Sequence, residues 1–236
     1  MIPLLMPLVM LQKRQAGANM KLLPEASGPT FGVVGDQAQA PFRIAVVGES
    51  TAAGCGVATH DEGFAAALAQ ELAFSLNRPV AWNVFAQHGA TARRIRYKLL
   101  PQMEESVDRA VLLAGANDVL AGRKPEQWGD DLAAIVDDLA GRAGEVTVVG
   151  IPAFKTFPSL PATLRRYLAE QATKLDGVSQ QICAPRPSVT WVTSTAMPDD
   201  LADFFAADGF HPSADGYRYW AHAVSRVAAR GANFIR

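Results

Sequence analysis

Short uninterrupted apolar runs alternate along the chain with stretches in which apolar residues recur every three or four positions. The recurring stretches predict amphipathic helices; one such face carries Trp128, Leu132, Ile135 and Leu139. The uninterrupted runs predict buried strands, at residues 42–47, 80–86, 110–114, 146–150 and 189–193. Strands that alternate with helices predict a parallel sheet covered on both faces. Right-handed crossovers make this an α/β fold, a three-layer α/β/α sandwich with five parallel strands.

The length and apolar content fit one domain with a large core. The chain has 236 residues, of which 49% are hydrophobic, and a chain of this size buries about 70% of its unfolded surface. We expect the domain over residues 42–236, after an N-terminal segment of residues 1–41. Residues 24–41 are rich in Gly, Pro, Ala and Gln and predict a connector.

Residues 1–11 are apolar and uncharged, and Lys13 and Arg14 follow them. The run is too short to span a membrane, and its charges follow the apolar stretch, whereas a secretory signal has them before it. One interpretation is a tail that docks on the domain or is poorly ordered. The other is a reversible contact of residues 1–14 with a membrane surface. The absence of a convincing export signal favours a cytoplasmic location.

Charge and cysteine content narrow the functional class. Lys and Arg number 22 against 23 Asp and Glu, a net charge of −1, so the basic excess of a nucleic-acid binder is missing. The two cysteines, Cys55 and Cys183, do not make a disulfide framework. The four histidines show none of the spacings of zinc motifs, which argues against a metal site.

Ligand crevices in parallel sheets lie beyond the carboxyl ends of the strands. Ser50 follows the first run within GESTAAG (residues 48–54), which matches neither a phosphate-binding loop nor a nucleophile elbow. A serine on such a turn predicts a hydroxyl that faces the crevice. The alternative is a helix N-cap, a position that serine favours.

The next two strands are also followed by candidate residues. Gly89 follows the second run and permits close approach of its N–H to a ligand. Asn117 follows the third run and carries an amide that can donate into the crevice. An ordinary turn glycine and an Asx turn are the alternatives. We interpret His88 as having no chemical role, and Cys55, close to Ser50, as a small packing residue.

Asp208 and His211 lie three positions apart, before the last predicted helix. Pro212 keeps His211 out of the helical region, and the spacing lets the carboxylate of Asp208 reach Nδ1 of the imidazole. That bond favours the tautomer with a free Nε2. The alternative is a solvated pair. The neighbouring Phe204, Phe205 and Phe210 disfavour it because they would screen the pair from water.

These residues combine into one catalytic hypothesis. Ser50 is the nucleophile, His211 its base and Asp208 the residue that orients the base. The N–H groups of Ser50 and Gly89 and the side chain of Asn117 would form an oxyanion hole. Three aromatic residues are candidates for a substrate pocket, or else pack on the scaffold: Phe154, Phe157 and Phe210.

The constellation resembles the SGNH hydrolases, also called the GDSL esterase/lipase family. Its named residues match Ser50, Gly89, Asn117 and His211, and the resemblance spans roughly residues 42–230. It implies a flavodoxin-like sheet and hydrolysis of small or lipid-like carboxylic esters through an acyl-enzyme, without metal or organic cofactor. The family usually has Asp before the nucleophile, whereas this chain has Glu49.

Three other functions stay open from the sequence. A carbohydrate O-deacetylase would use the same residues on acetylated sugars. A non-catalytic binding module on this fold, or a membrane-surface adaptor acting through residues 1–14, would not need them. The sequence fixes neither the acyl length, nor the alcohol, nor the oligomeric state.

Overall fold

The computed structural model describes residues 6–19, 23–36, 38–194 and 203–232. A six-stranded sheet in the order β1-β3-β2-β4-β5-β6 forms its centre. Its first strand in sequence, β1 (Phe31–Val34), pairs antiparallel with β3 at one edge. The other five strands run parallel: β2 (Phe42–Gly48), β3 (Val80–Ala86), β4 (Val107–Leu113), β5 (Ala143–Val149) and β6 (Val189–Val192).

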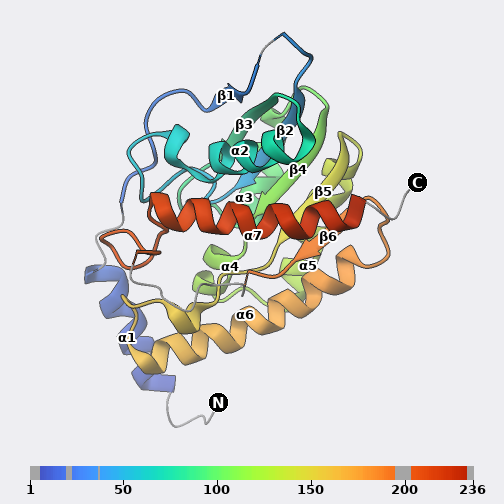
Figure 1. The fold of residues 1–236 in the computed structure, drawn as a ribbon. Helices are drawn as coiled ribbons and strands as arrows, with labels where there is room; N and C mark the ends of the chain where they lie inside the picture. The colour runs from blue at the N-terminus through green and yellow to red at the C-terminus, as the bar shows by residue number, and fades with distance from the viewer. Residues whose placement is uncertain (1–5, 20–22, 37, 195–202, 233–236) are drawn as a thin grey trace.

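The central strands are apolar on both faces because helices cover both faces. On β2, Ile44 and Val46 join one hydrophobic cluster, whereas Ala45 and Val47 join the other. The first cluster is covered by α2 (Phe64–Leu76) and α7 (Ala214–Ala232). The second is covered by α3 (Ala92–Arg94), the π-helical turn η3 (Ile95–Leu99), α5 (Pro125–Ala140) and α6 (Ala162–Cys183). The predicted three-layer α/β/α fold is confirmed (Figure 1).

Short elements complete the crossovers: η2 (His60–Glu62), η4 (Leu100–Gln102), α4 (Ala116–Ala121) and η5 (Phe154–Thr156). Of these, α4 begins directly after β4, at the same edge of the sheet as the turns after β2 and β3. The loop before α7 returns to this edge. Polar residues that are far apart in the sequence therefore meet at the carboxyl ends of the parallel strands, as the fold requires.

The sheet has one strand more than the sequence predicts. Strand β1 lies within residues 24–41, which were expected to form a connector. Its side chains alternate between exposed and half-buried, and Phe31 and Val33 are among the exposed ones. Because an edge strand of this kind needs no continuous buried apolar run, the pattern that marks the five parallel strands is missing here.

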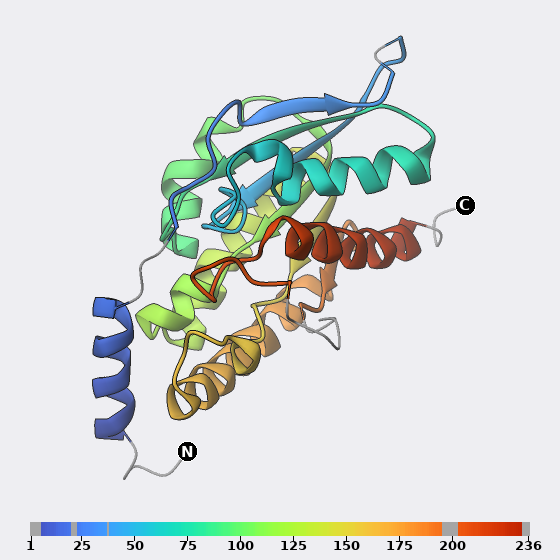
Figure 2. The same cartoon turned by 60° about the vertical axis from the view of Figure 1, so that its left-hand side comes forward.

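The N-terminal helix α1 (Met6–Asn19) lies outside the sandwich, beside the beginning of α6 (Figure 2). Val9 is fully buried, and the Gln12 side chain accepts a hydrogen bond from the Leu164 N–H at 3.1 Å. No helix in the described part of the chain has the length and apolarity needed to cross a bilayer. The contact of residues 1–14 with a membrane surface stays a prediction, and residues 1–5 lie outside the described residues.

Candidate active site

Ser50, His211 and Asp208 form one hydrogen-bonded chain. Ser50 lies on the turn after β2, and its Oγ is 3.0 Å from Nε2 of His211. The other ring nitrogen, Nδ1, is 2.6 Å from Oδ2 of Asp208. The side chains of His211 and Asp208 are each only 1% exposed. The structure thus brings together two segments 161 positions apart, and it does so away from solvent.

Asp208 is held by the backbone of its own loop. Its Oδ1 accepts the N–H groups of Phe210 and His211, each at 3.0 Å. Burial by itself raises the pKa of Asp208, but the hydrogen bonds from the His211 side chain and from these N–H groups outweigh it and lower the pKa to about 2. The carboxylate is therefore charged at neutral pH. It accepts a hydrogen bond from Nδ1–H of His211, which leaves the lone pair of Nε2 for Ser50.

The turn that carries Ser50 is fixed to its surroundings at both ends. The Glu49 N–H donates to the Leu113 carbonyl of β4 at 3.0 Å, and the Ser50 carbonyl accepts the Cys55 N–H at 3.0 Å. The Tyr217 hydroxyl, on α7, donates to the Cys55 carbonyl at 2.7 Å. These bonds connect the Ser50 turn to the helix that follows the His211 loop.

Glu49 is the site residue whose role the sequence did not predict. Its carboxyl group is buried and accepts the N–H groups of Ala116 and Asn117, both at 3.1 Å, and the Asn117 side-chain Nδ2 at 2.8 Å. Desolvation raises the pKa of Glu49 to about 8, although these donors act in the opposite direction. Glu49 thus ties the end of β2 to the beginning of α4, which carries Asn117.

Two of the predicted oxyanion donors have free N–H groups. Within the described residues, neither the Ser50 N–H nor the Gly89 N–H has a hydrogen-bond acceptor. Gly89 has φ +73°, which favours glycine, and there is open space where a Cβ would stand. Both groups are available to a ligand.

The Asn117 amide is already engaged, which the sequence did not predict. Its Nδ2 donates one hydrogen to Glu49 Oε2 at 2.8 Å and the other to the Ala90 carbonyl at 3.1 Å. An amide nitrogen has only two hydrogens to donate. A substrate oxygen can therefore gain this donor only by replacing or sharing the longer bond, that to Ala90.

An apolar cavity of about 30 Å³ lies beside the Ser50–His211 pair. Thr51, next to the serine, lines it together with Phe157, Phe205 and Phe210. Phe154 is fully buried in the hydrophobic core, where its ring packs on that of Phe157 with centroids 5.1 Å apart. Phe157 and Phe210 line this cavity, whereas Phe154 does not, and the role of all three in a substrate pocket stays a prediction.

The sequence model of the GDSL-like lipase/acylhydrolase family matches residues 46–219. The chain belongs to this family. The matched range of the GDSL-like domain runs from the end of β2 into α7 and includes every candidate site residue named above.

Related proteins carry the same family description or the same fold. The GDSL-like chain is 27% identical over 190 residues to the GDSL-like esterase Rv1075c of Mycobacterium tuberculosis, a match that covers 76% of this chain and 60% of that protein. The chain thus spans less than two thirds of the length of this relative.

Two solved structures show the fold of the GDSL-like chain. The crystal structure of TesA matches 80% of this chain and 99% of its own with a TM-score of 0.65 and 23% identity. The psychrotrophic esterase EstA from Pseudoalteromonas sp., in a structure inhibited by monoethylphosphonate, matches 81% of this chain and 99% of its own with a TM-score of 0.62 and 16% identity.

Proposed function

We propose that this protein is a serine esterase that hydrolyses carboxylic esters through an acyl-enzyme intermediate. The observation that carries the proposal is the buried chain from Ser50 Oγ through His211 to the charged carboxylate of Asp208. Membership of the GDSL-like family supports it. A weak nucleophile, a base in hydrogen-bond contact and a group that orients the base are the parts that acyl transfer requires.

In the first half-reaction, Ser50 Oγ attacks the ester carbonyl carbon while Nε2 of His211 takes its proton. The Asp208 carboxylate stabilises the imidazolium that forms. The N–H groups of Ser50 and Gly89 bind the oxyanion, and Asn117 adds a donor when it exchanges the Ala90 carbonyl for the substrate oxygen. His211 then gives the proton to the leaving alcohol, and the acyl group remains on Ser50.

In the second half-reaction, a water molecule attacks the acyl carbon and loses a proton to His211. The bond to Ser50 Oγ breaks, the carboxylic acid leaves, and His211 returns the proton to the serine. All proton transfers in both halves use His211. The steps need only groups of the chain, together with ester and water.

The acyl group is the part of the substrate that the site restricts. The apolar cavity lined by Phe157, Phe205 and Phe210 suits a short acyl group. A carbohydrate O-deacetylase is a second candidate because an acetyl group fits the same space. Comparing kcat/KM for acetylated sugars and for p-nitrophenyl acetate separates the two candidates.

The variant Ser50→Ala tests the function. We expect turnover of p-nitrophenyl acetate to fall by about 10³-fold or more, because the nucleophile is lost, with an unchanged melting temperature. Ser75→Ala, at an exposed position on α2, is the matched control and keeps full activity. Turnover near the wild-type rate in Ser50→Ala would contradict the proposal, and so would a wild-type protein that hydrolyses no ester, the result expected of a non-catalytic binding module.

A further inference from the structure

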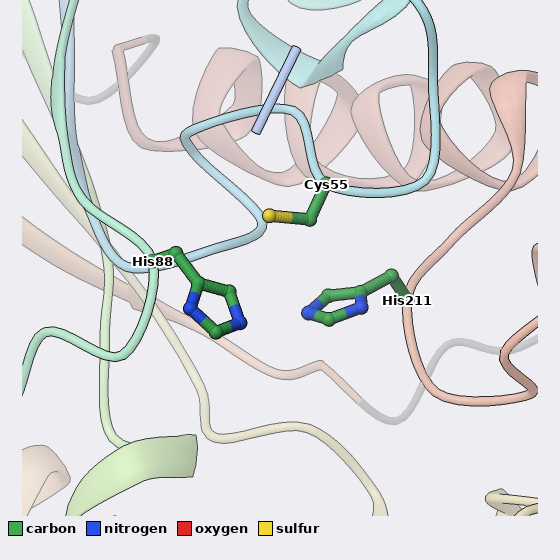
Figure 3. A group of neighbouring side chains, drawn as sticks. All are labelled: Cys55, His88 and His211. Atoms are coloured by element: carbon green, nitrogen blue, oxygen red, sulfur yellow. The ribbon is translucent and has the colours of Figure 1, made fainter. Parts of the chain in front are cut away.

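Cys55, His88 and His211 face one another across a small gap at the carboxyl edge of the sheet (Figure 3). They come from three separate loops: the turn after β2, the turn after β3 and the loop before α7. One ligand atom from each residue lies within 4.8 Å of the other two. Cys55 and His211 are buried and His88 is half-buried. Among the described residues this is the one such group of three His, Cys, Asp or Glu side chains.

The set of donor atoms matches the preferences of Zn²⁺. Zinc binds imidazole at about 2.0–2.1 Å and thiolate at about 2.3 Å, so the ligand atoms of one thiolate and two imidazoles lie about 3.3–3.6 Å apart in a tetrahedral site. The observed atoms lie within 4.8 Å of one another, so they must approach by no more than about 1.5 Å to reach that spacing. The imidazole rings of His88 and His211 lie close together, with their centroids 6.1 Å apart.

The surroundings of the group favour a cation. Asp208 holds Nδ1 of His211 at 2.6 Å, so the nitrogen that faces the gap is Nε2 with its lone pair free. A carboxylate on the far nitrogen is the usual support of a zinc-bound histidine. The Glu25 carboxylate accepts a hydrogen bond from the backbone N–H of His88 at 2.6 Å. The charges of Glu25 and Asp208 are both close enough to affect the Cys55 thiol. Two carboxylates therefore add negative potential beside the gap.

We infer that Cys55, His88 and His211 form an inhibitory Zn²⁺ site, with a water molecule as the fourth ligand. Zn²⁺ takes the lone pair of His211 Nε2 and so withdraws the base from Ser50. As the Zn–S bond forms, the Cys55 thiol releases its proton to solvent, and no atom changes oxidation state. The inhibition rests on the proposed role of His211, whereas the metal binding rests on the geometry of the group alone.

Zinc binds cysteine as the thiolate, so it must displace the thiol proton of Cys55 when it binds. Binding is therefore accompanied by proton release.

Cobalt absorption tests the site without any catalysis. In Ser50→Ala protein titrated with Co²⁺, we expect a thiolate-to-cobalt charge-transfer band that added Zn²⁺ removes. The band is lost in Ser50→Ala/Cys55→Ser and weakened in Ser50→Ala/His88→Gln. It is kept in Ser50→Ala/Cys183→Ser, the matched control, because Cys183 lies at the end of α6. Absence of the band in Ser50→Ala, or its persistence after Cys55→Ser, overturns the proposal.

Inhibition is measured separately. Zn²⁺ should inhibit p-nitrophenyl acetate hydrolysis by the otherwise wild-type protein, and EDTA should restore it. For Cys55→Ser and His88→Gln, each measured relative to its own zinc-free turnover, the inhibition constants for Zn²⁺ rise by about 10- to 100-fold. Cys183→Ser behaves as wild type. Equal inhibition of Cys55→Ser and wild type overturns the zinc site. A cobalt band in a protein that hydrolyses no ester keeps the site and rejects the esterase.

Discussion

The side-chain amide of Asn117 donates hydrogen bonds to two neighbouring residues. Its amide orients itself on Glu49 and on the Ala90 carbonyl, and in the proposed reaction it also meets the oxyanion. The bond to Glu49 fixes the amide before substrate arrives. In the proposed reaction, the amide exchanges its bond to the Ala90 carbonyl for one to the oxyanion.

For Asn117→Ala we expect kcat to fall by about 10²–10³-fold with little change in KM, since the lost bond forms mainly in the transition state. Steady-state kinetics on p-nitrophenyl acetate measures both constants. Asn83→Ala, at an exposed position on β3, is the control and should match wild type. A change in KM alone would contradict an oxyanion role for Asn117.

Glu49 gives the folded protein a pH dependence of known sign. Its pKa rises from 4.5 to about 8, chiefly because of burial. Between these pH values the folded protein keeps a proton that the unfolded chain has lost. The free energy of unfolding contributed by Glu49 is therefore greatest below pH 4.5 and falls as the pH rises towards 8.

The glutamine in Glu49→Gln cannot ionise. The free energy of unfolding of this variant should therefore decrease less between pH 5 and pH 8 than that of wild type, whatever its value at either pH. Urea unfolding at pH 5 and pH 8 measures the difference for wild type and variant. Glu126→Gln, on the exposed first turn of α5, should keep the wild-type difference. If wild type and Glu49→Gln lose equal stability between the two pH values, the buried carboxyl group does not act as described.

At the scale of elements, the site depends on the close packing of the Ser50 turn against the His211 loop. Gly56 has φ +107°, and a Cβ there would stand 2.2 Å from the Pro212 carbonyl oxygen and 3.3 Å from Cβ of His211. The positive φ disfavours any residue other than glycine, and an added Cβ would clash with the Pro212 carbonyl oxygen. The two loops can approach each other only because residue 56 has none.

Gly56→Ala should therefore lower the free energy of unfolding by more than about 1–2 kcal/mol, the cost of the left-handed backbone alone, and reduce esterase turnover as the two loops separate. Gly177→Ala is the matched control, because it lies within helix α6 with no heavy atom within 4 Å of the added Cβ. That variant should gain about 0.5–1 kcal/mol. Urea unfolding and turnover test both, and a Gly56→Ala protein as stable and active as wild type would rule out this packing.

The sequence best predicts the strands that are buried on both faces. Residues 44–48 of β2 and 110–113 of β4 are buried throughout, and Ser50 and Asn117 follow these two strands. Strand β1 escapes prediction because its exposed edge leaves no such run. The partners of Glu49 and Asn117 also escape it, since 67 positions separate Glu49 from Ala116. The group of Cys55, His88 and His211 also escapes prediction, because its members lie on three separate loops that come together only at the carboxyl edge of the folded sheet.

At the scale of the whole molecule, both helical layers contribute walls to the apolar cavity that we propose for the acyl group. The cavity of about 30 Å³ draws its walls from both sides of the sheet edge, including Phe157 after β5 and Trp220 on α7. An apolar pocket discriminates between acyl chains of different length, since one methylene group is worth about 1–3 kcal/mol there.

Among p-nitrophenyl esters with acyl chains of increasing length, kcat/KM should be highest for the shortest chains and fall by at least about tenfold for octanoate. Phe205→Ala, which removes a half-buried cavity wall, should shift the preference to longer chains. Phe74→Ala, at a side chain that is 91% exposed, should leave the profile unchanged. A wild-type preference for octanoate would show that the acyl chain binds elsewhere.

Covalent labelling with a fluorophosphonate, followed by peptide mapping with mass spectrometry, tests most directly whether His211 and Asp208 activate the hydroxyl of Ser50. The label should lie on Ser50 alone, be absent from Ser50→Ala, and form far more slowly in His211→Ala. A wild-type protein that is not labelled, or a label on any other residue, would contradict the assignment of Ser50 as the nucleophile.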